Sequence, residues 1–135
     1  MDKQSIQNLC NEAKKASQNA YAPYSNFHVG AALLANDGKV YHGCNVESSS
    51  YGLTICAERN AIASAVVHGE KEFKALAIYS SVGAAPCGAC RQVIWDICRD
   101  ITIFSIDKKG EISTYTSADI LPLPFDENKL KEAAL

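Results

Sequence analysis

The sequence has little net charge and few arginines, and both shortages narrow the classes of function. Of its 135 residues, thirteen are Lys or Arg and fifteen are Asp or Glu, which gives a formal net charge of −2. Only three arginines are present, and no run of basic residues is longer than two. Because polynucleotide binding depends on neutralising phosphates, this composition argues against a nucleic-acid partner.

Long hydrophobic runs are also missing. No stretch approaches the roughly 18 consecutive apolar residues that a membrane span needs, and the N-terminus lacks the basic and then apolar run of a signal peptide. The chain is 47% hydrophobic, so it can bury a core and is not disordered. We therefore expect a single cytoplasmic domain over residues 1–135, with no membrane partner.

Cysteine, in contrast, is plentiful, with six residues. A small secreted protein would pair them in disulfides, but a chain of this length buries enough surface to fold without such cross-links. In the cytosol, cysteines in a close pattern are more often metal ligands or catalytic groups. We therefore expect a metal-binding or catalytic role for some of them, and no disulfides.

Hydrophobic periodicity and turn residues predict a layered α/β domain. The expected order is α-β-β-α-β-α-β-β with a short C-terminal helix, and right-handed crossovers place both interior helices on one face of the sheet. Residues 45–53 are expected to form a polar loop. The predicted helices span 5–20, 55–68, 87–99 and 127–134, and the predicted strands span 27–35, 39–44, 73–80, 102–106 and 112–116.

Two short motifs open the interior helices and carry the candidate chemistry. They are Cys56-Ala57-Glu58 and Pro86-Cys87-Gly88-Ala89-Cys90. Cys87 and Cys90 are three residues apart and so share one helical face, while Cys56 adds a third sulfur from the neighbouring helix. Three soft ligands with one open position are typical of catalytic zinc. The helix N-termini favour the thiolate forms that zinc requires.

Two further features fit such a site. Three thiolates and Zn²⁺ carry a net charge of −1, which the adjacent Arg59 and Arg91 are expected to offset. Glu58 shares a helical stripe with the apolar residues at positions 62, 65 and 66, so it is expected to point inward, near the metal. A desolvated carboxyl group can move protons near neutral pH, and zinc lowers the pKa of its water towards about 7, giving hydroxide as a nucleophile.

Simpler interpretations remain open for single residues. Cys87 and Cys90 alone could be a redox pair or merely buried, and Glu58 alone could be a carboxylate that stabilises the start of its helix. Asn45 and Glu47 alternate on extended backbone and point the same way, which suits a ligand with several hydroxyl groups or a solvated strand end. Phe27 at a strand start would by default lie in the core.

The remaining cysteines are expected to pack in the core. Cys10 follows the helical period of the first predicted helix, and burial is also favoured for Cys44, which ends a strand. Cys98 belongs to a stripe on the third predicted helix that also contains Cys90, Val93, Ile94 and Ile97.

Taken together, these motifs resemble the cytidine deaminase family, in its small homotetrameric form. The wider zinc-deaminase signature is H-x-E followed by P-C-x-x-C, with Cys56 here in place of the histidine. One departure is Ser48-Ser49, where relatives often have Asn-Ala near their intersubunit contacts. The resemblance covers about residues 21–125, and it is carried by segments 24–32, 43–47, 51–61 and 121–125.

The resemblance implies a three-layer α/β/α fold with a mixed five-stranded sheet and one zinc ion per subunit. Cys56, Cys87 and Cys90 would hold the zinc, and Arg59 would moderate the charge of the thiolates. Glu58 would protonate N3 of cytosine and relay the proton of the attacking water to the leaving amine.

The resemblance also implies the substrate contacts. Phe27 would pack against the base, and the backbone of Ala57 would contact the pyrimidine edge. Asn45 and Glu47 would hydrogen-bond the sugar hydroxyls, chiefly the 3′-hydroxyl. In the homotetramer, two aromatic residues would reach or lie near the active site of a neighbouring subunit, namely Tyr51 and Phe125.

The expected activity is hydrolytic deamination of cytidine and 2′-deoxycytidine, a step of pyrimidine salvage. Deaminases of blasticidin-type antibiotics and deaminases of RNA and DNA share the zinc core. The Asn45/Glu47 pair favours a nucleoside over blasticidin. The small number of basic residues argues against a polynucleotide substrate. A structural zinc module would need a fourth protein ligand. A thioredoxin-like redox protein would leave Cys56 and Glu58 without a role.

Overall fold

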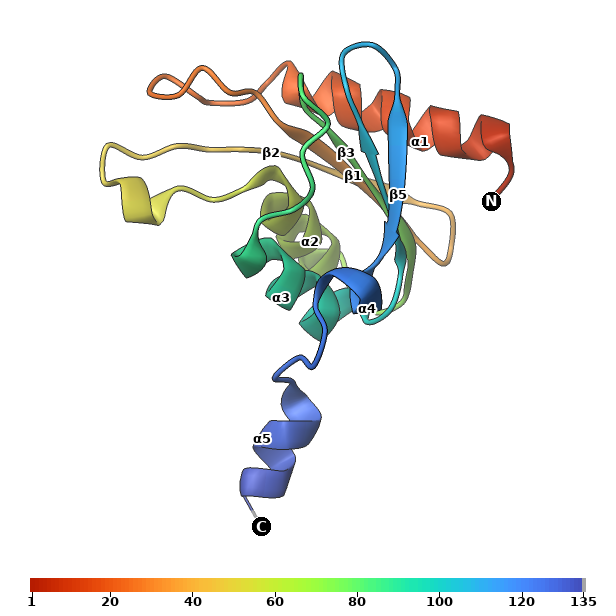
Figure 1. The fold of residues 1–135 in the computed structure, drawn as a ribbon, viewed down its shortest axis with the longest axis vertical. Helices are drawn as coiled ribbons and strands as arrows, with labels where there is room; N and C mark the ends of the chain where they lie inside the picture. Colours follow the sequence, from red (N-terminus) through yellow and green to blue (C-terminus); the bar gives the residue numbers. More distant parts are fainter. Residues whose placement is uncertain (135) are drawn as a thin grey trace.

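The computed structural model describes residues 1–134, which form a central sheet between two helical layers (Figure 1). The predicted domain 1–135 therefore ends one residue outside the described part. The sheet is mixed, because β3 and β4 are parallel and the other neighbours are antiparallel. Its strand order is β2-β1-β3-β4-β5, with β1 at Gly30–Ala35, β2 at Val40–Cys44, β3 at Phe73–Tyr79, β4 at Thr102–Ile106 and β5 at Ile112–Thr116.

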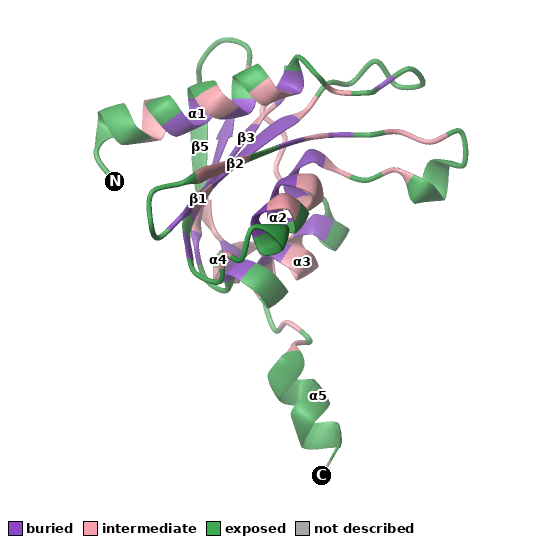
Figure 2. Ribbon diagram, turned by 180° about the vertical axis from the view of Figure 1, so that it is seen from behind, coloured by how far each residue is buried: buried purple, intermediate pink, exposed green. Residues whose placement is uncertain are grey.

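Helices cover both faces of the sheet. Helix α1 (Lys3–Ser17) packs the apolar side chains of Leu9 and Cys10 on one face, while α2 (Ala57–Val67) and α3 (Gly88–Cys98) pack on the other. The central strands are therefore buried on both sides, as the purple ribbon of Figure 2 shows. The predictions of an α/β/α layering and of both interior helices on one face are confirmed.

Strand β1 begins at Gly30 rather than at Phe27, where the sequence predicted its start. Asn26 has a left-handed backbone (φ 55°), which turns the chain just before this segment. The Asn45 side chain then forms hydrogen bonds with the main chain of Phe27 and Val29. Its Oδ1 accepts from Val29 N (2.9 Å) and its Nδ2 donates to Phe27 O (2.7 Å). A side chain thus replaces regular strand pairing at Phe27 O and Val29 N, while Val29 O accepts a single main-chain bond from Asn45 N (3.3 Å).

Other boundaries shift by a few residues. Helix α1 ends at Ser17, three residues early, and the chain then turns so that the Tyr21 amide donates to Asn45 O. A 3₁₀ turn at Tyr51–Leu53 lies inside the predicted loop, and a four-residue helix, α4 (Ser117–Ile120), was not predicted. Such short pieces carry too few apolar positions to show a period.

The predicted C-terminal helix is present as α5 (Glu127–Ala133). It has no buried residue and projects away from the rest of the protein (Figures 1 and 2). No helix within residues 1–134 is long and apolar enough to cross a membrane.

The core stripes of α2 and α3 are narrower than the sequence predicted. Val66 is 48% exposed and Ile97 is 39% exposed, so both lie beyond the buried face of their helices. Cys44 is half-buried rather than fully packed, whereas Cys10 and Cys98 are buried as expected. A 3.6-residue period gives the centre of a helical stripe well, but its edges depend on how closely the neighbouring layer approaches.

Gly43 lets β2 lie directly on the backbone of α2. A Cβ built at this residue would lie 2.2 Å from Ala57 O and 2.4 Å from Ala61 N. Because backbone atoms of a packed helix cannot shift as a flexible side chain can, Gly43→Ala is expected to lower the free energy of unfolding by about 3 kcal/mol, measured by urea denaturation. Gly52→Ala is the matched control, since its Cβ would meet nothing within 4 Å, and it should change stability by less than about 0.5 kcal/mol. Similar small effects of the two substitutions would contradict this packing argument.

Candidate active site

Three cysteines from two helix starts come together on one side of the sheet. Cys56 is the N-cap of α2, Cys87 is the N-cap of α3, and Cys90 lies in the first turn of α3. Their sulfur atoms all lie within 4.8 Å of one another, and the sulfurs of Cys56 and Cys87 are 3.8 Å apart. Because the positive ends of two helix dipoles meet at this cluster, it favours deprotonated thiolates.

The cluster has the dimensions of a zinc site. In a tetrahedral site with Zn–S bonds of about 2.3 Å, neighbouring sulfurs are separated by about 3.8 Å, which is the spacing of Cys56 and Cys87. Within residues 1–134 the group contains no fourth His, Cys, Asp or Glu. Three ligands with a free fourth position match a catalytic zinc site better than a structural one. All six cysteines of the chain are free thiols.

Arg59 is the cation that contacts the thiol cluster. Its Nη2 lies 3.5 Å from Cys56 Sγ. A hydrogen bond from the Cys90 thiol, followed by those from Arg59 and Cys87, lowers the pKa of Cys56 to about 5 against the opposing effect of burial. The same contact raises the pKa of Cys90, and hydrogen bonds to Cys56 and Cys90 raise the pKa of the Arg59 guanidinium.

Arg91 does not contact the thiols, contrary to the expectation from its position beside Cys90. Its Nε donates to Pro86 O (2.7 Å) and its Nη1 donates to Ile120 O (3.1 Å). Both partners are main-chain carbonyls, so Arg91 ties the start of α3 to the end of α4. Each arginine directly follows a predicted site residue, Glu58 for Arg59 and Cys90 for Arg91. Sequence proximity alone therefore could not tell the two arginines apart.

Glu58 points inward, as predicted, and is only 5% exposed. Burial, assisted by the nearby Cys56 thiolate, raises the pKa of its carboxyl group to about 6. A carboxyl group with this pKa can both accept and donate a proton near neutral pH. It lies in the first turn of α2, two residues after Cys56, which brings its carboxyl group close to the thiol cluster.

A cavity of about 330 Å³ opens over Glu58 and the cysteines. It is lined by most of the predicted site residues, namely Phe27, Asn45, Glu47, Cys56, Ala57, Glu58 and Cys87. Neither Lys nor Arg is among its lining residues within the described chain. The sequence analysis missed the residues that complete the wall, namely Ser25, Val29, Thr54, Ile78, Ser80, Ala84 and Ala85.

Two predicted residues lie outside this cavity of the same chain. Tyr51 is 74% exposed and packs edge-on against Tyr24, with ring centroids 5.9 Å apart, in an adjoining hollow. Phe125 is 62% exposed and follows α4, and its carbonyl accepts from Gln92 Nε2 (2.6 Å). The contacts with a neighbouring subunit that the resemblance implies for these two residues stay predictions.

Buried serines hold the cavity wall next to Cys87. Ser80 Oγ accepts from Ala84 N (3.0 Å), and Ser105 Oγ donates to Ala84 O (2.9 Å). Both serines are almost fully buried at the ends of β3 and β4. Serine at the end of an apolar strand is the signal that could have identified this wall from the sequence, because a buried hydroxyl needs a hydrogen-bond partner.

Asn45 and Glu47 both face the cavity and both bind the chain that leads into β1. The Asn45 amide bonds to the main chain of Phe27 and Val29 as described above. Glu47 Oε1 accepts from Tyr24 N (3.0 Å) and Ser25 N (3.1 Å), and Glu47 Oε2 accepts from the Ser25 hydroxyl. These hydrogen bonds, led by that from the Ser25 side chain, lower the pKa of Glu47, so it is a firmly ionised acceptor.

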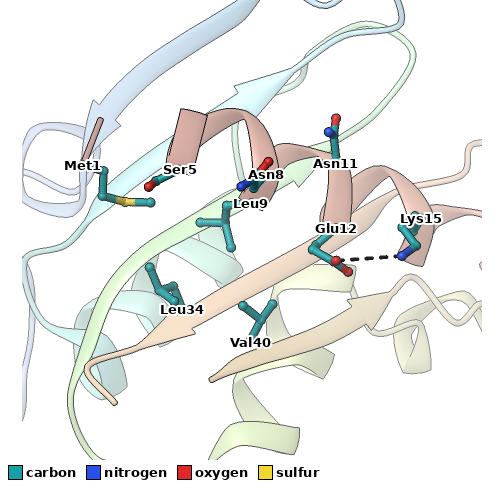
Figure 3. Close-up of a pocket in the computed structure, with 9 residues that line it drawn as sticks. All are labelled: Met1, Ser5, Asn8, Leu9, Asn11, Glu12, Lys15, Leu34 and Val40. Carbon is teal, nitrogen blue, oxygen red and sulfur yellow. Dashed lines mark ion pairs between the residues drawn. The ribbon is translucent and has the colours of Figure 1, made fainter. Parts of the chain in front are cut away.

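A larger groove of about 650 Å³ lies elsewhere, between α1 and the β1–β2 hairpin (Figure 3). Its floor is formed by Leu9, Leu34 and Val40, and its only acidic side chain, Glu12, is paired with Lys15 and with His42. Among residues 1–134, no cluster of metal-ligating groups lies in this groove. The smaller cavity, lined by Glu58, Cys56 and Cys87, is therefore the candidate active site.

Comparison with known proteins gives consistent matches. Residues 3–105 match the family model described as the cytidine and deoxycytidylate deaminase zinc-binding region. The chain is 48% identical over 132 residues to a cytidine deaminase of Sporosarcina psychrophila, covering 96% of this chain and 97% of the relative. A crystal structure of cytidine deaminase from Burkholderia pseudomallei superposes with a TM-score of 0.87 at 45% identity, covering 93% of this chain and 100% of that one. A blasticidin-S deaminase of Bacillus cereus is 32% identical over 111 residues, covering 75% of this chain and 79% of the relative.

Proposed function

The chain belongs to the cytidine and deoxycytidylate deaminase family, and we propose that this enzyme hydrolyses free cytidine and 2′-deoxycytidine to uridine and 2′-deoxyuridine, with release of ammonia. The observation that carries the proposal is the cavity in which a buried, protonatable Glu58 lies beside three convergent thiols. We also propose that residues 1–135 form one catalytic domain and that the enzyme is cytoplasmic and serves pyrimidine salvage.

The thiol cluster fits one zinc ion per subunit. Zinc held by Cys56, Cys87 and Cys90 supplies a Lewis acid that lowers the pKa of water towards about 7. Glu58 takes a proton from the attacking water and delivers it to N3 of the cytosine ring. After oxygen has added to C4, Glu58 carries the second proton to the exocyclic amine, which leaves as ammonia. Water and cytidine thereby give uridine and ammonia with no further reactant.

The cavity walls support binding of a neutral nucleoside. Phe27 provides an apolar surface for the base, and the backbone of Ala57 lies beside Glu58 for the pyrimidine edge. Asn45 and Glu47 supply hydrogen-bonding groups for the sugar hydroxyls. Because neither Lys nor Arg lines the cavity within the described residues, the phosphate of a nucleotide would have no charged partner.

We propose a homotetramer in which neighbouring subunits complete each active site. The largely exposed aromatic side chains of Tyr51 and Phe125 support this arrangement, because rings of this size gain most from being covered by another surface. Both residues belong to segments that match the family pattern, whereas Ser48-Ser49 departs from it.

The proposal is tested by ammonia release from the purified zinc-loaded protein. Cytidine and 2′-deoxycytidine are expected to be deaminated, with CMP and blasticidin S as parallel substrates that react far more slowly. The comparison with blasticidin S matters because one relative of this chain bears that name. Zinc-loaded tetramer that releases no ammonia from either nucleoside would contradict the proposal and favour a zinc-binding module. Faster release from blasticidin S would change the substrate class but keep the chemistry.

A further inference from the structure

Ser25 occupies a central place in the hydrogen-bond network at the cavity wall. Its hydroxyl proton is donated to Glu47 Oε2, and its oxygen accepts from Phe27 N at 3.0 Å. A serine hydroxyl has a single proton to donate, and here Glu47 accepts it. The oxygen of the same hydroxyl accepts from Phe27 N, so the side chain bonds to both residues at once. Ser25 thereby links the carboxylate of Glu47 to the main chain that carries Phe27, two residues that line the same cavity.

The two oxygens of Glu47 are held differently. Oε1 accepts two main-chain N–H groups, from Tyr24 and Ser25, at 3.0 and 3.1 Å. The Ser25 hydroxyl is the partner given to Oε2 by the described residues. The plane of the carboxylate is therefore set by Ser25, because the two main-chain donors meet one oxygen and leave the other free to rotate. An ionised carboxylate accepts hydrogen bonds only, so the unused lone pair of Oε2 suits a hydroxyl proton.

The same hydroxyl also steadies the neighbouring wall. Asn26 is held in a left-handed conformation, with φ of 55°, and the chain must turn through it before reaching Phe27. The hydrogen bond from Phe27 N to Ser25 Oγ spans this turn. Without it, the turn would keep the main-chain bond from Asn26 N to Ala22 O (3.0 Å), the Asn45 bond to Phe27 O (2.7 Å) and the contact of Asn26 Oδ1 with His28 Nε2 (3.2 Å). None of these engages the Phe27 amide, from which the Ser25 hydroxyl accepts.

We propose that Ser25 is a positioning and specificity-determining residue, whose hydroxyl fixes the Glu47 carboxylate in the orientation that binds a sugar hydroxyl. The inference rests on the proposed nucleoside deaminase function and adds a residue to it. Ser25 acts through Glu47 and Phe27 rather than on the reacting atoms. A carboxylate held in place before the substrate arrives binds more tightly, because less conformational freedom is lost on binding.

The test compares Ser25→Ala with Ser25→Thr, which keeps the hydroxyl, and with Ser113→Ala, an exposed serine of β5 outside the cavity. Cytidine and 3′-deoxycytidine are the two substrates. For Ser25→Ala, KM for cytidine is expected to rise about 10-fold, since hydrogen bonds to charged groups are among the stronger ones, while kcat stays within about twofold. KM for 3′-deoxycytidine should rise only about twofold in the same variant, because this substrate lacks the hydroxyl that Glu47 binds. Ser25→Thr should restore most of the affinity, and Ser113→Ala should match the wild type.

A double-mutant cycle separates positioning from a general structural effect. In a Glu47→Gln background, Ser25→Ala is expected to raise KM for cytidine by no more than about twofold, since the charged acceptor that Ser25 positions is already replaced by a neutral amide. Equal losses for both substrates, a fall in kcat alone, an unchanged KM, or full additivity with Glu47→Gln would each overturn the inference. The wild-type enzyme is assayed in parallel. Its failure to deaminate cytidine would reject the proposed function itself, whereas normal wild-type turnover with any of those four results rejects only the role of Ser25.

Discussion

Glu58→Gln is expected to lower kcat for cytidine by about 10²–10⁴-fold while the protein keeps its fold and its zinc. The amide has nearly the same shape as the carboxyl group, so it fills the buried space that Glu58 occupies at 5% exposure. It cannot take a proton from water and pass it to N3 and the amine. Steady-state kinetics and metal analysis on the same preparation measure both parts of this expectation.

Stability gives an independent check on the Glu58 variant. Because burial raises the pKa of Glu58 to about 6, the folded protein must hold a buried charge above that pH. The neutral form stabilises the fold at low pH, and this contribution is lost as the pH rises from about 4.5 through about 6. At pH 8 the metal-free Gln variant should therefore melt at the same temperature as the metal-free wild type or higher.

An exposed glutamate provides the matched control for Glu58. Glu111→Gln, in the turn before β5, should leave both activity and melting temperature unchanged. Retention of more than about a tenth of wild-type kcat by Glu58→Gln would remove this residue from the proton-transfer role, because even modest general acid–base catalysis exceeds that factor.

The fold was largely predictable because its periodic elements are long and its turns are marked by characteristic residues. The strands β4 and β5 begin and end where the apolar pattern predicts, and Asn36-Asp37-Gly38 marks the hairpin between β1 and β2. The errors lie where a side chain competes with the strand ladder, as Asn45 does at Phe27 and Val29. A one-dimensional pattern contains no information about such a partner eighteen residues away.

The metal cluster was predictable for a related reason. Both cysteine motifs begin helices on the same face of the sheet, so the topology alone brings their sulfurs together. The cavity wall was not predictable in the same way, because it is built from loops whose path depends on individual hydrogen bonds. Ser25 and Ser80 illustrate this, since the hydroxyl of each accepts a hydrogen bond from the main chain of a loop. Arg91 was misplaced for the same reason, because its main-chain partners belong to Pro86 and Ile120.

Cys87→Ala is expected to abolish stoichiometric zinc binding and to lower kcat/KM by about 10³-fold or more. Metal activation of water contributes several kcal/mol to transition-state stabilisation, and each 1.36 kcal/mol corresponds to about a factor of ten in rate. Cys87 is the exposed member of the cluster, so its removal leaves the hydrophobic core intact. The metal-free variant should therefore be about as stable as the metal-free wild type.

Cys98→Ala separates a ligand cysteine from a packing cysteine on the same helix. Cys98 is buried in the core and does not belong to the thiol cluster. Its replacement should keep one zinc per chain and near-normal activity, but should lower the free energy of unfolding by about 1 kcal/mol through the cavity it leaves. The two variants should therefore behave in opposite ways. Cys87→Ala should be inactive but as stable as the metal-free wild type, whereas Cys98→Ala should be active but less stable. Normal zinc content in Cys87→Ala, or loss of zinc in Cys98→Ala, would mean that the metal is bound elsewhere than at the N-termini of α2 and α3.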